Sequence, residues 1–213
     1  MVTKSFTTIF IVSFVFLFCE FVESYSKEEA LARFATSTPL RIVQCSLNSS
    51  SSGGPFHHGG SLAITLRSDL SPNAAFAFEQ HVRNGYYDGC YIFRVLKGFV
   101  AQFGFQPKKQ SSTRITRPMP DLVTEHSLRN ERGTLAFAGA SAVQVYVNLG
   151  NNKRLDSDGL PFAQLSQDSM AMLDKLDTSH KDGDGQIAAI KAGDNVVVTK
   201  FPRMTKIDSC IVL

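Results

Sequence analysis

The sequence has little net charge, no tryptophan and few cysteines. Its 22 Lys and Arg residues nearly balance 19 Asp and Glu residues, and both signs are spread along the chain. Nucleic-acid-binding domains usually gather basic residues on one face, so the composition predicts no nucleic-acid partner. With 43% hydrophobic and 19% charged residues among 213, the chain instead has the composition of a folded domain that can bury its own core.

Cysteine and histidine do not occur at the spacing of metal ligands. One of the four cysteines lies in an N-terminal apolar segment, and the others are Cys45, Cys90 and Cys210. They include no C-x-x-C pair, and no histidine follows them at ligand spacing. The paired histidines at 57–58 lie in a Ser- and Gly-rich loop without an evident third ligand. We therefore expect no metal site.

Long apolar runs are confined to the N-terminus. Lys4 precedes 14 uncharged residues that run from Phe6 to Cys19. At ~1.5 Å per helical residue this run spans about 21 Å, which is short of a hydrocarbon core of ~30 Å. A basic start, a short apolar stretch and a small residue at Ser24 are typical of a secretory signal peptide.

The sequence thus predicts three segments: a signal peptide at 1–24, an N-terminal arm at 25–39 and a domain at 40–213. We expect the mature chain to reside in the secretory pathway, in the ER lumen or outside the cell, without stable membrane insertion. A membrane-tethered form is an alternative, through the uncleaved segment or through Cys210, because the final CIVL resembles a prenylation signal.

Short apolar or alternating runs predict strands along the domain. They lie at 40–47, 61–66, 91–96, 99–105, 133–138, 143–149, 195–200 and 207–213. Ser71 and Pro72 predict the start of a helix that ends at Asn84, and a second helix is expected over 167–176. The DGDG run at 182–185 is interpreted as a turn. Two helices among about eight strands, without regular βαβ alternation, predict a mainly β fold: a closed antiparallel barrel capped by the helices.

Residues 84–104 carry a spaced motif and read NGYYDGCYIFRVLKGFVAQFG. Its pattern, F-x-R-x-x-x-G-F-x-x-Q-x-G with Ile92 in the first place, resembles the signature of the cyclophilins, the cyclophilin-type peptidyl-prolyl cis-trans isomerases. The resemblance continues through RGTLAFA at 132–138, QVYVNLG at 144–150 and LD at 155–156, in the order of the family. It implies an eight-stranded cyclophilin-like barrel in a divergent, secreted member.

The resemblance also implies a catalytic arginine, Arg94, beside a proline pocket. Rotation about an X-Pro bond has a barrier of ~18–20 kcal/mol, because the C–N bond has partial double-bond character. Twisting makes the nitrogen basic, so a fixed guanidinium can donate a hydrogen bond to it in the transition state but not in the planar ground state. The positions that match the family's substrate-binding residues are Phe99, Val100, Gln102, Gln144, Tyr146 and Leu155.

From these matches we expect a monomeric isomerase that acts on X-Pro bonds of proline-containing client polypeptides and uses no cofactor. Several positions depart from the family, however, and the stretch between Ala138 and Gln144 is shorter than usual. Gly139 or Ser141 stands for an Asn, Arg154 for a Trp, Tyr146 for a Phe, and Leu160 with Pro161 for a His and its neighbours. The alternative is a catalytically weak or silent module that binds peptides through the same groove or through the basic stretch at 106–120.

The resemblance bears on the cysteines too. Cys45 and Cys210 fall on terminal strands that are neighbours in cyclophilin-like barrels, which suggests a disulfide between them. With three cysteines in the mature chain, at most one internal bridge can form, and three thiols are the alternative.

Overall fold

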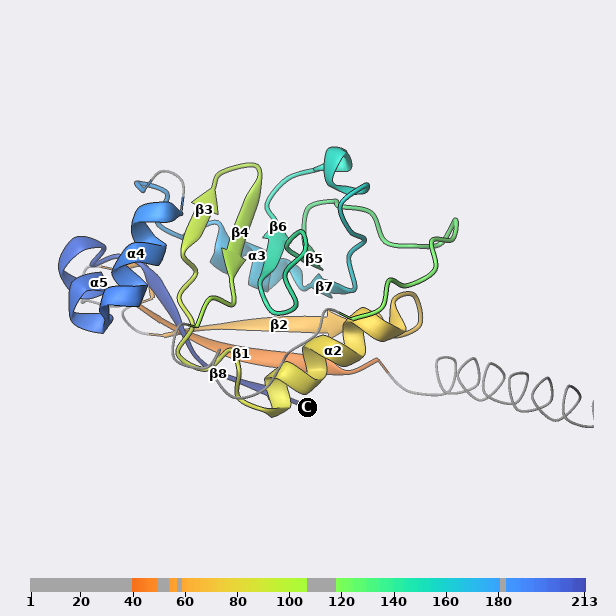
Figure 1. Cartoon of the computed structure of the whole chain (residues 1–213), viewed down its shortest axis with the longest axis horizontal. Coiled ribbons are helices and arrows are strands. Elements are labelled where there is room, and N and C mark those ends of the chain that lie inside the picture. The colour runs from red at the N-terminus through yellow and green to blue at the C-terminus, as the bar shows by residue number, and fades with distance from the viewer. Residues whose placement is uncertain (1–39, 50–53, 57–58, 107–117, 181–182) are drawn as a thin grey trace, which may run out of the picture. The chain divides into compact units, whose positions relative to one another are not determined.

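The computed structural model describes residues 40–49, 54–56, 59–106, 118–180 and 183–213. Within this part, eight antiparallel strands form one sheet in the order β3-β4-β6-β5-β7-β2-β1-β8 (Figure 1). The strands are β1 (Ile42–Ser49), β2 (Gly60–Leu66), β3 (Arg94–Leu96), β4 (Val100–Phe103), β5 (Thr134–Phe137), β6 (Val145–Asn148), β7 (Ala163–Leu165) and β8 (Thr205–Val212). The predicted signal peptide, the arm, His57, His58 and most of the basic stretch lie outside the described residues.

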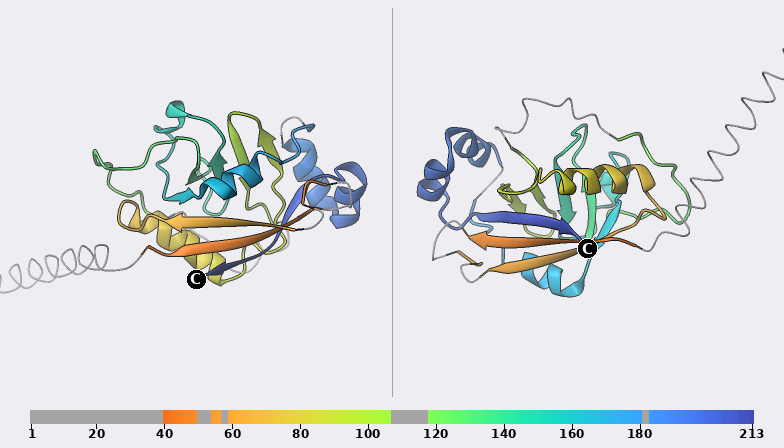
Figure 2. Two further views of the ribbon diagram at one scale, coloured as in Figure 1. Left: turned by 180° about the vertical axis from the view of Figure 1, so that it is seen from behind. Right: turned by 90° about the horizontal axis from the view of Figure 1, so that it is seen from below.

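Four α-helices and one 3-10 turn accompany the sheet in this part of the chain, whereas two helices were predicted. They are α2 (Pro72–Arg83), α3 (Gln167–Leu173), α4 (Asp184–Ala192), α5 (Asp194–Lys200) and η1 (Lys153–Leu155). The first two confirm the predicted helices, and they lie on opposite sides of the long strands β1, β2 and β8 (Figure 2). None of the described helices combines the length and the apolar character that a membrane span requires.

The start of α2 agrees with the sequence, but another residue caps it. The helix begins at Pro72 after Ser71, as predicted. The hydroxyl of Ser71, however, donates to the carbonyl of Pro161 at 3.0 Å and does not cap the helix. Instead the carboxylate of Asp121 accepts two N–H groups of the first turn, at 2.8 and 3.0 Å. Burial nevertheless raises the pKa of Asp121, because desolvation outweighs these two hydrogen bonds.

Residues 195–200 belong to α5, so the strand predicted there is wrong. Three consecutive valines favour extended backbone, but Gly193, with φ of 118°, ends α4, and Asp194 places a negative charge in the first turn of the next helix. Val197 is fully buried in a cluster with Tyr91 and α4. Tertiary packing therefore overrides the local strand preference. The turn predicted at 182–185 is also wrong from Asp184 onward, where α4 begins.

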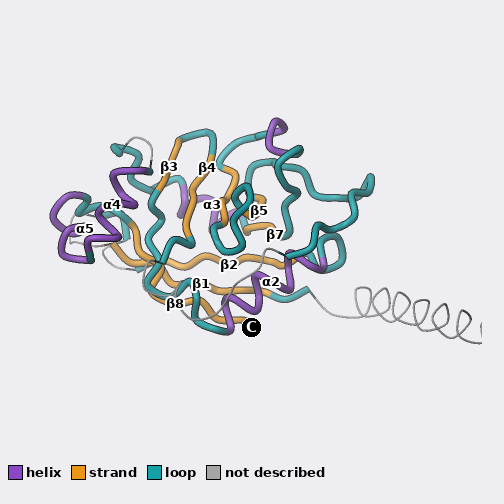
Figure 3. Tube along the Cα trace, viewed as in Figure 1, coloured by secondary structure: helices purple, strands orange, loops and turns teal. Residues whose placement is uncertain are grey.

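The sheet does not close, which corrects the predicted barrel. β3 and β8 are its two edges. The segment before β3 contacts β8 through a bridge between Tyr91 and Lys206 and through backbone hydrogen bonds between residues 89–92 and 205–207. Beyond this bridge, Leu176 and His180, from the segment after α3, line a small cavity together with Val95 of β3. Within the described chain, β3 itself forms no ladder with β8. The result is an open half-barrel (Figure 3).

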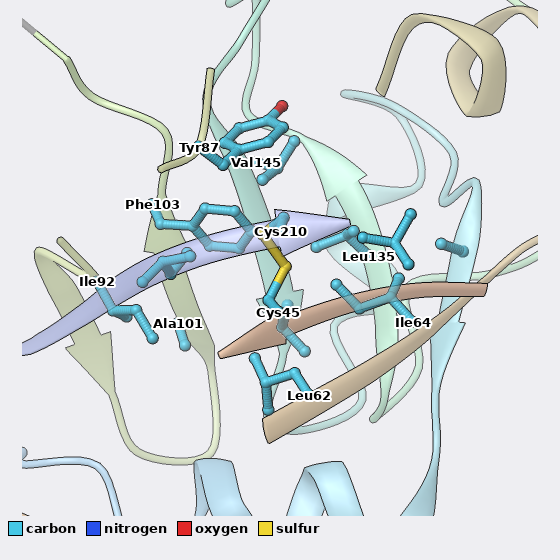
Figure 4. Close-up of a cluster of buried hydrophobic side chains, with 14 of the residues drawn as sticks. Cys45, Leu62, Ile64, Tyr87, Ile92, Ala101, Phe103, Leu135, Val145 and Cys210 are labelled. Carbon is cyan, nitrogen blue, oxygen red and sulfur yellow. A yellow bond between two sulfur atoms is a disulfide. The ribbon is translucent and has the colours of Figure 1, made fainter. Parts of the chain in front are cut away.

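The main core lies inside this half-barrel, and a disulfide within it joins the strands β1 and β8. Figure 4 shows Cys45 of β1 bonded to Cys210 of β8 beside Leu62, Ile64 and Phe103. The two cysteines face each other in the strand register, and their pairing confirms the disulfide that the resemblance suggested. The bond joins strands from opposite ends of the described domain and fixes one edge of the sheet.

Candidate active site

A row of four residues crosses the strands β3, β4, β6 and β5. Arg94 is paired with Gln102, Gln102 with Tyr146, and Tyr146 with Ala136. Residues that lie directly opposite each other in antiparallel strands point to the same face of the sheet. The next residues along these strands, Val95, Ala101, Val147 and Leu135, form a parallel row that is buried in the main core. The row with Arg94 therefore occupies the face away from that core.

A chain of hydrogen bonds links the polar members of this face. Nη1 of Arg94 donates to Oε1 of Gln102 at 3.4 Å, and Nε2 of Gln102 donates to Oε1 of Gln144 at 2.9 Å. All three side chains are half-buried, so part of each is open to solvent. The two glutamines therefore orient a charged donor at the surface of the sheet.

An apolar floor lies next to this chain. Val100, Ala136 and Tyr146 are buried together on the outer face, in a cluster separate from the main core. Phe99 and Leu155 pack against this cluster and are half-buried. The structure thus brings together all seven residues that the sequence predicted for the site, although they come from three strands, the segments just before β4 and β6, and η1. The role of each residue stays a prediction.

Three buried asparagines support the floor from below, and the sequence did not predict their role. The side chains of Asn130, Asn148 and Asn152 are 0%, 0% and 7% exposed. The hydroxyl of Tyr146 donates to Oδ1 of Asn130 at 2.8 Å, and Nδ2 of Asn130 donates to Asp156 at 2.9 Å. The only available signal was the repeated Asn within the apolar sequence at 145–152, which does not reveal burial.

The environment of Tyr146 keeps its hydroxyl protonated. Burial raises the pKa of Tyr146 well above its ordinary value, and the negative charges of Asp158 and Asp156 add to this effect. The raised pKa agrees with the role of the hydroxyl as a hydrogen-bond donor to Asn130. Because the hydroxyl of Tyr146 points to the buried amide of Asn130, the side chain contributes its ring to the floor as an apolar surface.

A second set of contacts holds the backbone at Phe99. The carbonyl of Phe99 accepts the N–H of Leu149 and Nδ2 of Asn152, both at 2.8 Å. The neighbouring backbones approach so closely that a Cβ on Gly150 would collide with the carbonyl oxygen of Gly98. Only glycine fits at position 150, and its presence allows the turn before β4 to pack on the loop after β6.

The chain is similar to a known protein family over most of its length. The family model described as cyclophilin type peptidyl-prolyl cis-trans isomerase/CLD matches residues 55–200, which is more than half of the chain. The chain belongs to this family. As in a cyclophilin-like fold, the sheet is mainly antiparallel β, and the low identity to known members agrees with a divergent cyclophilin.

Among relatives, peptidyl-prolyl cis-trans isomerase B of Escherichia coli (strain K12) is 32% identical over 112 residues, which cover 49% of this chain and 66% of the relative. A peptidyl-prolyl cis-trans isomerase of Acinetobacter baylyi is 29% identical over 103 residues, or 46% of this chain and 54% of the relative. The chain thus spans about half to two thirds of the length of these relatives.

A crystal structure of a Cryptosporidium parvum cyclophilin type peptidyl-prolyl cis-trans isomerase has the same fold. It gives a TM-score of 0.55 at 17% identity and covers 82% of this chain and 98% of its own. The same protein crystallised in the presence of the dipeptide Ala-Pro gives a TM-score of 0.54 at 18% identity, over 81% of this chain and 98% of its own.

The shortened stretch of this cyclophilin, between Ala138 and Gln144, forms a tight turn. The N–H of Ala138 donates to the carbonyl of Gln144 at 2.8 Å, and Gly139 has φ of 51°. The hydroxyl of Ser141 accepts the N–H groups of Val143 and Gln144, at 3.2 and 2.9 Å. This hydroxyl is thus used within the turn.

Proposed function

We propose that the chain isomerises X-Pro bonds of client polypeptides, with Arg94 as the electrostatic catalyst. The observation that carries this proposal is the position of Arg94, which is hydrogen-bonded to Gln102 beside the floor of Phe99, Val100, Tyr146 and Leu155. A charged donor next to an apolar surface of this kind suits a proline ring and the bond that precedes it.

Isomerisation of an X-Pro bond requires a hydrogen-bond donor near the proline nitrogen and a surface that holds the proline ring. The barrier of ~18–20 kcal/mol comes from amide resonance, and twisting the bond removes that resonance. In the twisted state the proline nitrogen carries a lone pair, to which a guanidinium N–H can donate. The floor holds the pyrrolidine ring while the preceding carbonyl rotates. Because the planar substrate offers no such acceptor, the hydrogen bond lowers the barrier selectively.

We further propose that the protein acts in an oxidising compartment of the secretory pathway. The apolar segment from Phe6 to Cys19 has the length and flanks of a signal peptide, and the Cys45–Cys210 disulfide fits an oxidising compartment. N-terminal sequencing of the exported protein tests this proposal: the account predicts a mature chain that starts near Tyr25.

Exchange of an X-Pro peptide, followed by NMR, tests the isomerase. Arg94→Ala is expected to lower kcat/KM by about 10²-fold, which corresponds to about 3 kcal/mol. The matched control is Arg203→Ala, because the side chain of Arg203 is 58% exposed and its closest acidic group is 3.9 Å away. Binding without turnover by the folded wild-type protein would contradict the isomerase and favour the silent peptide-binding module, which the tight turn at Ser141 makes the second candidate.

A further inference from the structure

Two guanidinium groups lie near the ring of Phe99. The Cζ atom of Arg154 is 4.4 Å from the ring centroid, and that of Arg94 is 5.8 Å away. The place of Arg154 follows from the packing of the turn at Gly98 against the loop at Gly150, because this loop leads directly into η1. Arg154 thus covers part of an aromatic surface that the proposed proline pocket would use.

The two segments that meet here carry positive charge only. Lys97 follows β3, and Lys153 and Arg154 begin η1; all three are exposed and have no ion pair within the described part of the chain. Residues 97–99 and 149–155 contain no acidic residue. The rim of the site on this side therefore has an unneutralised positive charge.

The nearest acidic residues in the sequence are directed elsewhere. Asp156 accepts hydrogen bonds from the backbone and side chain of Asn130, both at 2.9 Å. Together with Asp158 it lines a neighbouring pocket of about 290 Å³, which also contains Asp121 and Phe137 but not Phe99. These two carboxylates thus line a neighbouring pocket, whereas the segments that meet beside Phe99 carry lysine and arginine.

We propose that Arg154 makes the site selective for X-Pro segments that carry Asp or Glu next to the proline. The stacked guanidinium is planar and already oriented, and a carboxylate can accept two parallel N–H groups from it. Cation–π contacts of exposed side chains are weak, so a substrate carboxylate can draw Arg154 away from Phe99 at small cost. The same movement uncovers the ring for the proline. This inference rests on the proposed function, because it assigns a substrate class to the same site.

A peptide series measures the selectivity. Peptides with Glu, Gln or Lys immediately before or immediately after the proline are compared by NMR, through both their affinity and their exchange rate. At low salt, the wild-type protein is expected to bind and turn over one of the Glu peptides about tenfold better than its Gln counterpart, and the Lys peptide least well. The preference should shrink as salt is added, because exposed charges are screened.

Two variants of Arg154 and one control test whether the preference for Glu peptides depends on this residue. Arg154→Gln should reduce the tenfold Glu preference to less than twofold, whereas Arg154→Lys should keep a part of it, since the charge remains. The control is Lys175→Gln, which removes one exposed positive charge near the end of α3 and should leave the preference unchanged.

Equal values for Glu and Gln peptides at both positions, with normal turnover of an Ala-Pro peptide, would overturn this inference and leave the proposed isomerase intact. A preference that persists in Arg154→Gln would also overturn it. Failure of the folded wild-type protein to bind or turn over any of the peptides would instead refute the proposed function, and this inference with it.

Discussion

The two faces of the strands β3, β4, β6 and β5 have different chemistry although their residues alternate in sequence. The inner row, from Val95 to Leu135, is wholly apolar and buried in the main core. The outer row contains Arg94, Gln102 and Tyr146. One face can therefore provide stability while the other provides function, and a shift of register by one residue would exchange them.

The largest expected effect concerns the disulfide that ties β1 to β8. Cys45 and Cys210 are 165 residues apart, and a loop of that size gives a stabilisation of about 5 kcal/mol in the chain-entropy model. The double substitution Cys45→Ser with Cys210→Ser should lower the free energy of unfolding by about 2–5 kcal/mol. Urea denaturation measures this loss. Wild-type protein treated with reductant is the control and should lose a similar amount, while equal stability in all samples would contradict the prediction.

Two leucines, one on each face, test whether the inner face provides stability and the outer face provides function. Leu135 is fully buried on the inner face, so Leu135→Ala should cost about 2–5 kcal/mol of unfolding free energy. Leu155 is half-buried on the outer floor, and its substitution by Ala should cost about 1 kcal/mol or less but raise KM for an X-Pro peptide. Urea denaturation and peptide exchange distinguish the two variants. A higher KM in Leu135→Ala than in Leu155→Ala, both folded, would break the comparison.

The buried amides beneath the outer face should contribute a smaller amount. Asn130→Ala leaves the hydroxyl of Tyr146 without its acceptor and removes one acceptor of Asn148, at an expected cost of about 1–3 kcal/mol. Asn195 is exposed on α5, so Asn195→Ala is the matched control and should cost under about 1 kcal/mol. Thermal unfolding of both variants provides the measurement, and equal losses would show that the amide network does not support the floor.

The smallest expected effect depends on pH. His81 packs against Phe137 of the inner face, and its Nε2 lies 3.0 Å from the carbonyl oxygen of Ala142 in the turn beside the site. Burial lowers the pKa of His81 below its ordinary value of 6.5, although the hydrogen bond to Ala142 opposes this shift.

The sign of the pH effect follows from this shift. The unfolded chain binds a proton near pH 6.5, where folded His81 is still neutral, so stability should fall as the pH decreases from about 6.5 towards the folded pKa. Urea denaturation over this range measures the fall, and His81→Gln should reduce it. An unchanged slope in His81→Gln would assign the pH dependence to other groups.

Most of the strands could be predicted from the sequence, because they show local alternation of apolar and polar residues. The residues of the site could be predicted as a group, because one spaced motif carries most of them. Seven of the eight predicted strands exist, whereas the three valines at 196–198 are helical, since burial of Val197 and the break at Gly193 decide the conformation there. The short strand β7 has only three residues and gave no pattern. The open edge was not predicted either, because it depends on which strands pair, and no local signal shows that β3 and β8 stay unpaired.

Some features of the site could be predicted from the sequence and others could not. Phe99, Gln102 and their partners were predicted from the motif, but the hydrogen bond of Tyr146 to Asn130 joins residues that are 16 positions apart. The stacking of Arg154 on Phe99 likewise depends on the close approach of two loops. Such long-range contacts follow from the fold and not from residue order.

A peptide-binding map by NMR shows which of the two faces binds the substrate. The methyl signals of labelled Val and Leu residues are recorded with an Ala-Pro peptide and with a matched Ala-Gly peptide. The signals of Val100 and Leu155 on the outer floor are expected to shift with Ala-Pro, whereas those of Val147 and Leu135 on the inner face are not. Shifts confined to Val123 and Leu160, which line the neighbouring pocket, would contradict this expectation.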